Sequence, residues 1–196
     1  MNRNSTVSLA YIALFAALTA IGAFIKIPLP YVPFTLQVLF VFFAGSLLGS
    51  KRGMQSQFVY VGIGLAGLPV FTQGGGIGYF LQPTFGYLLG YIAGAFVVGW
   101  MIERIDNPKT YHFIFANLVG LLVVYLIGVP YLYIALNVWM GVPSSWTHVW
   151  MIGFVYSILG DIVMSVIAGV LVTRLHKVFG KVRNMKPTRV QKERMV

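Results

Sequence analysis

Long apolar stretches alternate along the chain with short stretches rich in proline, glycine or charge. A helix needs about 20 apolar residues to cross a bilayer, and at that length the pattern predicts about six spans. The third apolar stretch is short for a full crossing, so we expect the loop after it to dip into the bundle. We expect Pro130 to end or kink the fifth helix, because proline lacks a backbone donor, and Ser145 to cap the sixth. The predicted helices lie at about 6–25, 34–49, 54–68, 84–102, 111–129 and 146–178.

The composition indicates an integral membrane protein. Hydrophobic residues make up 58% and charged residues 9% of the 196 residues, whereas soluble domains carry about 25% charge. We therefore expect an all-α integral membrane protein, a six-transmembrane-helix bundle with outer lid loops. We expect one membrane domain over residues 1–196, with the bundle at about 6–179 and a basic cytoplasmic tail at 180–196. The chain has no cysteine, which excludes disulfides, thiolate metal ligands and cysteine nucleophiles.

The basic residues predict the orientation of the chain. If both termini lie in the cytoplasm, 13 of the 14 Lys and Arg residues fall on the cytoplasmic side, and Lys26 alone falls outside. Cytoplasmic loops of membrane proteins carry an excess of Lys and Arg. We therefore predict a multi-pass protein of the cell membrane with both termini cytoplasmic. The net charge of +10 then faces anionic lipid headgroups and does not indicate nucleic-acid binding.

A glycine-rich stretch, GLPVFTQGGGIGYFLQPTFGYLLGY at 67–91, interrupts the apolar pattern between the third and fourth helices. Its glycines and prolines require the backbone to leave helix geometry. Irregular backbone survives in lipid only where protein or a wet cavity covers it. We therefore predict a folded loop that caps or lines a cavity; the alternative is a solvated connecting loop. The candidate binding residues in this stretch are Phe71, Gly75, Gly76, Tyr79, Gln82 and Tyr87.

Asp161 is the one acidic residue of the sequence inside a predicted span. A charged side chain at the centre of a membrane helix costs about 2.5–3.5 kcal/mol on insertion scales, so Asp161 must face the bundle or a cavity. Ser157, Asp161, Ser165 and Ala168 fall on one narrow helical face, and no predicted span offers a basic partner. We favour a ligand-binding role for Asp161. The alternative is a structural aspartate satisfied by neighbouring hydroxyls.

Three uncharged polar residues within the spans could complete such a site. Thr35 and Gln37 lie near the outer end of the second helix, and Asn117 lies in the fifth. A carboxylate, an amide and a hydroxyl together suit a ligand that has both N–H donors and a C=O acceptor. For Gln37 or Asn117 alone, the alternative is an interhelical hydrogen bond.

Small residues also form a stripe on the first helix. Because small side chains let helices approach closely, the stripe predicts either packing inside the bundle or a docking face for another membrane protein. The residues predicted to dock a partner are Ala13, Ala16, Ala17 and Ala20.

The sequence does not predict an enzyme, a metal site or a resident cofactor. It holds no HExxH, no GxSxG, no paired carboxylates and no nucleophile with a base. His112, His148 and His176 do not have ligand spacing. The pattern GIGLAG matches a dinucleotide fingerprint, but it lacks the strand and the acidic residue that this motif requires.

Several segments together resemble the BioY family, the biotin-specific S components of energy-coupling factor (ECF) transporters. They occur in the order expected for that family and cover most of the chain. The matching segments are PYVPFTLQ (30–37), AGSLLGSKRG (44–53), GLPVF (67–71) with the glycine run after it, PTFGYLLGY (83–91) and GDIVMSVIAG (160–169). The alanines of the first helix also resemble the family's Ala-x-x-x-Ala docking motif.

The resemblance implies a six-helix substrate-binding subunit that captures biotin from outside. A partner ECF module, made of a transmembrane coupling subunit and two ATP-binding subunits, would supply the energy. Asp161 would match the family's aspartate and bond the ureido N–H groups. The resemblance leaves open which groups hold the valerate carboxylate; Lys26 is one candidate. One departure is that Met164 stands where the family usually has a lysine, which removes a charge partner of the aspartate.

Two other classes of protein are weighed against this one. A self-contained secondary transporter or channel for a small polar solute is the main alternative, but it usually needs internal repeats or more than one intramembrane charge. A membrane-embedded enzyme would need a catalytic pair, which the sequence does not offer.

Overall fold

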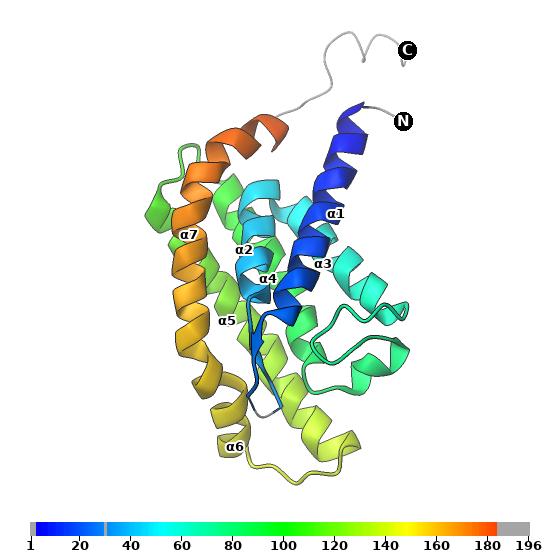
Figure 1. Ribbon diagram of the computed structural model, residues 1–196. Helices are drawn as coiled ribbons and strands as arrows, with labels where there is room; N and C mark the ends of the chain where they lie inside the picture. Colours follow the sequence, from blue (N-terminus) through cyan, green and yellow to red (C-terminus); the bar gives the residue numbers. More distant parts are fainter. Residues whose placement is uncertain (1–2, 30, 184–196) are drawn as a thin grey trace.

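The computed structural model describes residues 3–29 and 31–183, which form a bundle of α-helices with one short hairpin (Figure 1). The basic tail predicted at 180–196 lies outside the described residues from position 184 onward. The helices are α1 (Arg3–Phe24), α2 (Gln37–Leu48), α3 (Ser50–Leu65), the 3₁₀ turn η1 (Ile77–Leu81), α4 (Phe85–Glu103), α5 (Thr110–Ile134), the π turn η2 (Ala135–Trp139), α6 (Trp146–Trp150), the π turn η3 (Met151–Val155) and α7 (Tyr156–Arg183).

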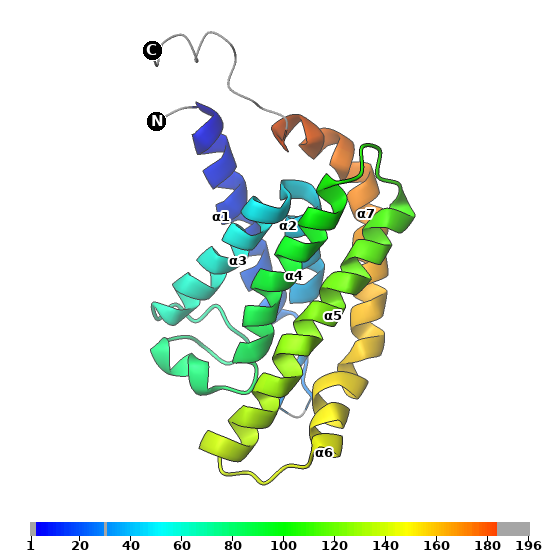
Figure 2. The same ribbon diagram turned by 180° about the vertical axis from the view of Figure 1, so that it is seen from behind.

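The short helix α2 occupies the centre of the bundle. It contacts α1, α3, α4, α5 and α7, and nine of its 12 residues are buried. The two opposite views show α1 and α7 on different sides of the bundle, with α4 and α5 side by side across the back (Figures 1 and 2). A helix of 12 residues can serve as the centre because the extended strand β2, Phe34–Thr35, continues the chain beyond its start.

The outer surface of the bundle is apolar, as a membrane protein requires. Within the described residues, four helical segments are long and apolar enough to cross a bilayer: Thr6–Phe24, Phe85–Glu103, Thr110–Trp139 and Trp146–His176. Large side chains on their outer faces, such as Leu122, Leu126 and Leu159, are more than half exposed. The predicted all-α membrane bundle is confirmed. Its second and third members, α2 and α3, are shorter than full crossings.

Two details of the predicted helices need correction. Of the two expectations for Pro130, that it ends the fifth helix is wrong, because α5 continues through Pro130 to Ile134; that it kinks the helix stays a prediction. A proline in a membrane helix is tolerated where neighbouring groups and local adjustments satisfy the freed carbonyl. Ser145 does cap the last span, since its side chain accepts a hydrogen bond from the backbone N–H of His148 at 3.2 Å. That span is not one regular helix, because the π turn η3 separates α6 from α7.

A hairpin and a glycine-rich loop cover one end of the bundle, which we call the hairpin end. Strands β1 (Lys26–Ile27) and β2 pair antiparallel. At the opposite end α1 begins and α7 ends (Figure 1). The loop at 66–84 folds back on α3, where the N–H of Gly76 donates to the carbonyl of Gly64 at 2.7 Å. Its Phe71 and Tyr79 are 1% and 4% exposed, so this is a folded loop and not a solvated connection.

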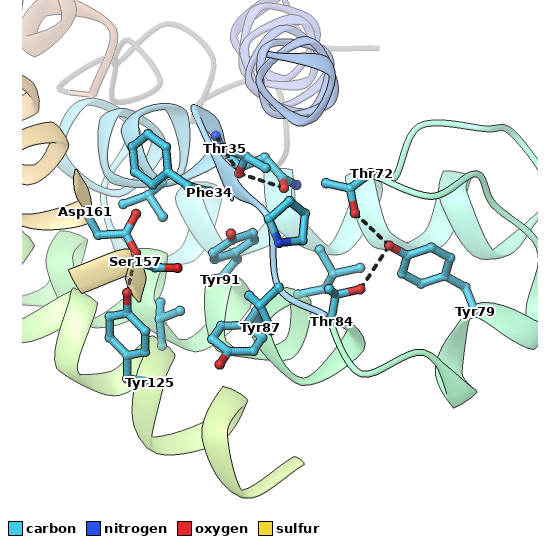
Figure 3. A pocket seen from close by; sticks show the side chains of 16 residues that line it. Phe34, Thr35, Thr72, Tyr79, Thr84, Tyr87, Tyr91, Tyr125, Ser157 and Asp161 are labelled. Carbon is cyan, nitrogen blue, oxygen red and sulfur yellow. Dashed lines mark hydrogen bonds between the residues drawn. The ribbon is translucent and has the colours of Figure 1, made fainter. Parts of the chain in front are cut away.

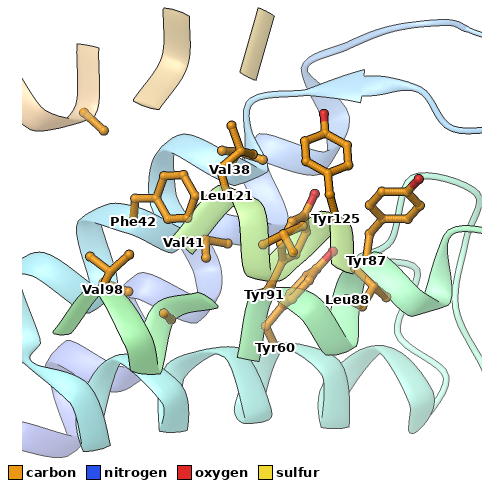
Figure 4. Close-up of a cluster of buried hydrophobic side chains, with 14 of the residues drawn as sticks. Val38, Val41, Phe42, Tyr60, Tyr87, Leu88, Tyr91, Val98, Leu121 and Tyr125 are labelled. Carbon is orange, nitrogen blue, oxygen red and sulfur yellow. The ribbon is translucent and has the colours of Figure 1, made fainter. Parts of the chain in front are cut away.

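The buried side chains change in character along the bundle. Phe42, Val98 and Leu121 form an apolar core in the part away from the hairpin. Tyrosines, among them Tyr87 and Tyr125, replace them toward the hairpin (Figure 4). A buried tyrosine needs a partner for its hydroxyl, so this half of the interior must also supply polar groups.

Candidate functional site

A pocket lies among these tyrosines, beneath the hairpin and the glycine-rich loop. It encloses about 520 Å³ that protein atoms do not fill, including space open to solvent. The described residues that line it are Val32, Pro33, Phe34, Thr35, Gln37, Val38, Thr72, Tyr79, Thr84, Tyr87, Leu88, Tyr91, Val124, Tyr125, Ser157 and Asp161 (Figure 3).

The charge of the pocket comes from Asp161 on α7. Its Oδ2 accepts a hydrogen bond from the hydroxyl of Tyr125 on α5 (Figure 3). Asp161 is 7% exposed, and the described residues that line the pocket include no Lys, Arg or His. A neutral hydroxyl therefore stabilises this carboxylate in place of an ion pair. Among the described residues, no side chain or backbone N–H donates to the second oxygen, Oδ1, which remains free to accept from a ligand.

Tyr87 on α4 joins the pocket to the π turn η3. Its hydroxyl donates to the carbonyl of Gly153 at 2.7 Å. Its ring meets that of Tyr125 edge to face, with 6.1 Å between ring centres. The two rings form an aromatic wall of the pocket. Such a wall suits an apolar ring of a ligand.

Polar side chains at the start of α2 form a connected chain. The hydroxyl of Thr35 donates to Oε1 of Gln37 at 3.1 Å. The Nε2 of Gln37 donates to the hydroxyl of Tyr60 at 2.8 Å, and Tyr60 donates to the carbonyl of Val70 at 3.1 Å. This chain fixes the position of the Gln37 amide and joins the hairpin to the glycine-rich loop.

A second set of hydrogen bonds closes the side of the pocket formed by the loop. The hydroxyl of Tyr79 shares hydrogen bonds with Thr72 at 3.1 Å and with Thr84 at 3.0 Å. The Nζ of Lys26 on β1 donates to the carbonyl of Thr72. Hairpin and loop are thus joined directly over the pocket.

Five of the predicted binding residues line this pocket, namely Thr35, Gln37, Tyr79, Tyr87 and Asp161. The structure does not place the other five on its lining. They are Phe71, Gly75, Gly76, Gln82 and Asn117. The position of Met164 one turn after Asp161 also lies off the lining.

The five residues off the lining have other environments. Phe71 packs behind Tyr79, with 4.4 Å between ring centres, and against Tyr60 at 5.4 Å. Gly75 and Gly76 shape the loop, and Gln82 is half-buried before α4. Asn117 is fully buried; its Nδ2 donates to the carbonyl of Ser165 at 3.0 Å. This is the interhelical hydrogen bond that the sequence analysis gave as the alternative to ligand binding by Asn117.

Sequence reasoning did not select several residues that the pocket uses. Tyr91 follows Tyr87 by one helical turn, so the spacing of the two tyrosines could have indicated a shared face. Tyr125 gave no such signal, because nothing in an apolar helix marks one tyrosine as the partner of a carboxylate 36 positions away. Ser157 was noticed only as part of the polar stripe that contains Asp161.

The alanines of α1 divide between two environments. Ala13 and Ala17 are exposed on the outer face of α1, Ala20 is half-buried, and Ala16 is 4% exposed and packs into the core. The part of the stripe that a partner could reach is therefore Ala13 and Ala17.

These features define a class of protein: a polytopic α-helical membrane protein that holds a small-molecule pocket with one buried carboxylate at one end of its bundle. The chain belongs to the BioY family, whose model matches residues 1–181.

Similar proteins support this assignment. The chain is 58% identical over 193 residues to a probable biotin transporter BioY of Lysinibacillus sphaericus, covering 98% of each chain. It is 39% identical over 165 residues to the biotin transporter BioY of Thermotoga maritima, covering 84% of this chain and 92% of that one. The fold resembles the crystal structure of the S-component for biotin from an ECF-type ABC transporter. That match has a TM-score of 0.77 and 29% identity, and it covers 90% of this chain and 95% of that one.

Proposed function

We propose that this protein is the biotin-binding S component of an ECF-type vitamin uptake transporter. It captures biotin from the extracellular side and delivers it for import that a partner module drives with ATP. Biotin is its transported ligand and not a cofactor, and the protein itself is not an enzyme.

The observation that carries the proposal is the pocket built around Asp161 in a member of this family. Biotin has a cyclic urea with two N–H donors, an apolar thioether ring and a carboxylate tail. The free oxygen of Asp161 can accept from a urea N–H. The rings of Tyr87, Tyr91 and Tyr125 offer an apolar wall to the thioether ring. Closure of the hairpin and loop over the ligand would exclude water and strengthen these hydrogen bonds.

Titration calorimetry with biotin tests the proposal. We expect the purified wild type to bind biotin and Asp161→Ala to lose tight binding. A thermal melt of each protein checks that the variant still folds. Unchanged affinity in a folded Asp161→Ala protein would remove Asp161 from the site, and a wild type that does not bind biotin would contradict the function.

We also propose that the hairpin end faces the outside of the cell. Its support is the placement of charge: Lys26 lies at the hairpin end. Toward the opposite end lie Lys51 and Arg52 at the start of α3, Arg104 just after α4, Lys109 just before α5 and Arg174 in the last part of α7. Because the chain has no cysteine, single introduced cysteines report orientation cleanly. A membrane-impermeant maleimide on intact cells should label Ile27→Cys and leave Lys109→Cys unlabelled; the reverse pattern contradicts the orientation.

The partner in this proposal is an ECF module of one transmembrane coupling subunit and two ATP-binding subunits. The exposed Ala13 and Ala17 would form the docking face on α1, since close helix approach needs small side chains. Ala17→Leu should reduce co-purification of the module while calorimetric biotin binding stays at the wild-type value. Proteoliposomes that hold the lone subunit should not accumulate biotin. Uptake by the lone subunit would instead favour a self-contained transporter.

A further inference from the structure

Three hydroxyls on the helices of this protein bond to their own backbone. The hydroxyls of Thr19, Ser165 and Thr173 each donate to the carbonyl four residues earlier, at 2.8, 2.7 and 2.9 Å. This is the common arrangement for serine and threonine in membrane helices, because it satisfies the donor without any other partner. A hydroxyl that uses this bond has no donor left for a ligand.

Ser157 departs from this arrangement. It is 4% exposed, yet its Oγ has no hydrogen-bond partner among the described residues. The carbonyl four residues earlier belongs to Gly153, and that carbonyl accepts the hydroxyl of Tyr87 from α4. Gly153 lies in the π turn η3, and such turns often occur at functional sites. Tyr87 thus occupies the acceptor that Ser157 would otherwise use.

Ser157, whose hydroxyl has no partner among the described residues, belongs to the lining of the pocket. Ser157 stands one helical turn before Asp161 on α7, and both side chains line the pocket (Figure 3). Residues four apart share a helix face. The neighbouring hydroxyls of Thr35, Tyr79 and Tyr125 are already engaged with protein partners. A buried polar group left unpaired costs free energy, so its persistence beside a pocket points to a partner that arrives from outside the chain.

We propose that Ser157 is a ligand-binding residue that donates to the carbonyl oxygen of the cyclic urea, while Asp161 accepts from the adjacent N–H. The proposal rests on biotin binding as proposed above. Asp161 can only accept when ionised, and a urea presents a C=O beside its N–H groups, so recognition of both requires a donor next to the carboxylate. Ser157 supplies that donor, and the site therefore forms hydrogen bonds to both the urea carbonyl and the urea N–H.

Two alanine variants on α7 test this role by titration calorimetry. Ser157→Ala should weaken biotin binding about five- to tenfold, the range of one hydrogen bond. Ser165→Ala is the matched control: Ser165 is also buried, but it bonds to the Asp161 carbonyl and lies off the lining. The biotin affinity of the Ser165→Ala protein should stay within about twofold of the wild-type value. Ser157→Thr keeps the hydroxyl and should retain most of the affinity.

A second ligand separates hydrogen bonding from packing. The analogue 2-thiobiotin carries a thione sulfur, a weaker acceptor, in place of the urea oxygen. The wild type should prefer biotin over 2-thiobiotin, and Ser157→Ala should reduce this preference by about the factor it loses in biotin affinity. A purely structural serine would lower both affinities equally. An unchanged preference in a folded Ser157→Ala protein overturns the inference.

The role of Tyr87 is tested by a double-mutant cycle. Tyr87→Phe removes the hydrogen bond that Tyr87 makes to the Gly153 carbonyl. The Ser157 hydroxyl should then donate to that carbonyl and no longer to the ligand. Adding Ser157→Ala in the Tyr87→Phe background should then cost less than twofold in biotin affinity. Additive effects would contradict the link between the two residues. A wild type that binds no biotin would refute the proposed function, whereas binding with an unaffected Ser157→Ala refutes this inference alone.

Discussion

The hydroxyl of Tyr125 on α5 donates to Oδ2 of Asp161 on α7, across 36 positions of sequence. This hydrogen bond satisfies one oxygen of a buried carboxylate without a positive charge. It also orients the carboxylate, whose other oxygen, Oδ1, has no hydrogen-bond donor among the described residues. The pair therefore gives the site a negative acceptor of fixed direction, which the insertion cost of a membrane aspartate would otherwise make unfavourable.

Tyr125→Phe should weaken biotin binding by at least about tenfold. The variant keeps the ring that packs on Tyr87 and Phe154 and removes only the donor, and a hydrogen bond to a charged group is worth about 1.5–3 kcal/mol. Calorimetry measures the change. Tyr111→Phe, at an exposed position of the same helix, is the control and should bind as the wild type does. A Tyr125→Phe protein with wild-type affinity would show that Asp161 needs no such support.

Asn117→Ala should lower stability and leave biotin affinity unchanged. The Asn117 amide donates to the carbonyl of Ser165 and accepts from Ser46 at 3.5 Å, so it joins α2, α5 and α7 away from the pocket. Interhelical hydrogen bonds in membranes contribute about 0.6 kcal/mol on average and about 1.7 at most. Thermal unfolding in detergent should shift down by a few degrees. A loss of biotin affinity without a loss of stability would return Asn117 to the binding site.

Lys26→Met should speed the release of biotin. The variant removes the hydrogen bond from Lys26 to the Thr72 carbonyl that joins hairpin to loop. Because lids over a ligand control its escape, the dissociation rate should rise about two- to fivefold in a chase experiment with labelled biotin. Lys26→Arg keeps a charged donor and is the control.

The same variant tests whether Lys26 also holds the biotin carboxylate. Biotinamide lacks that charge. If Lys26 acts only through Thr72, Lys26→Met should change the dissociation of biotin and biotinamide by the same factor. A larger effect on biotin would instead assign the carboxylate to Lys26.

Gly64→Ala should destabilise the protein, while Gly62→Ala should not. A Cβ at Gly64 would overlap the ring of Phe71, whereas a Cβ at Gly62 on the same helix meets nothing within 4 Å. Overpacking of a filled core typically costs about 1–3 kcal/mol. Thermal unfolding of the two variants measures the difference. Equal melting temperatures would show that the loop does not pack on α3 as described.

Much of the architecture follows from the sequence because its causes are local. A run of apolar residues must lie in lipid, so the helices appear at nearly the positions that the hydrophobic pattern predicts. Asp161 could be predicted as a site residue from the sequence, since a carboxylate within a span must face the bundle interior or a cavity. Some local features could not be predicted from the hydrophobic pattern. It does not indicate the π turns or a helix that continues past Pro130.

The contacts that make the site could come only from the tertiary structure. The sequence determined a membrane bundle with a buried carboxylate under a folded glycine-rich loop. It did not determine that Tyr125 would meet that carboxylate, that Asn117 would turn away from it, or that Tyr87 would leave the Ser157 hydroxyl free. Apolar periodicity assigns a residue to a face of its own helix. Which faces meet depends on how distant helices pack, and that packing sets the hydrogen bonds of the pocket.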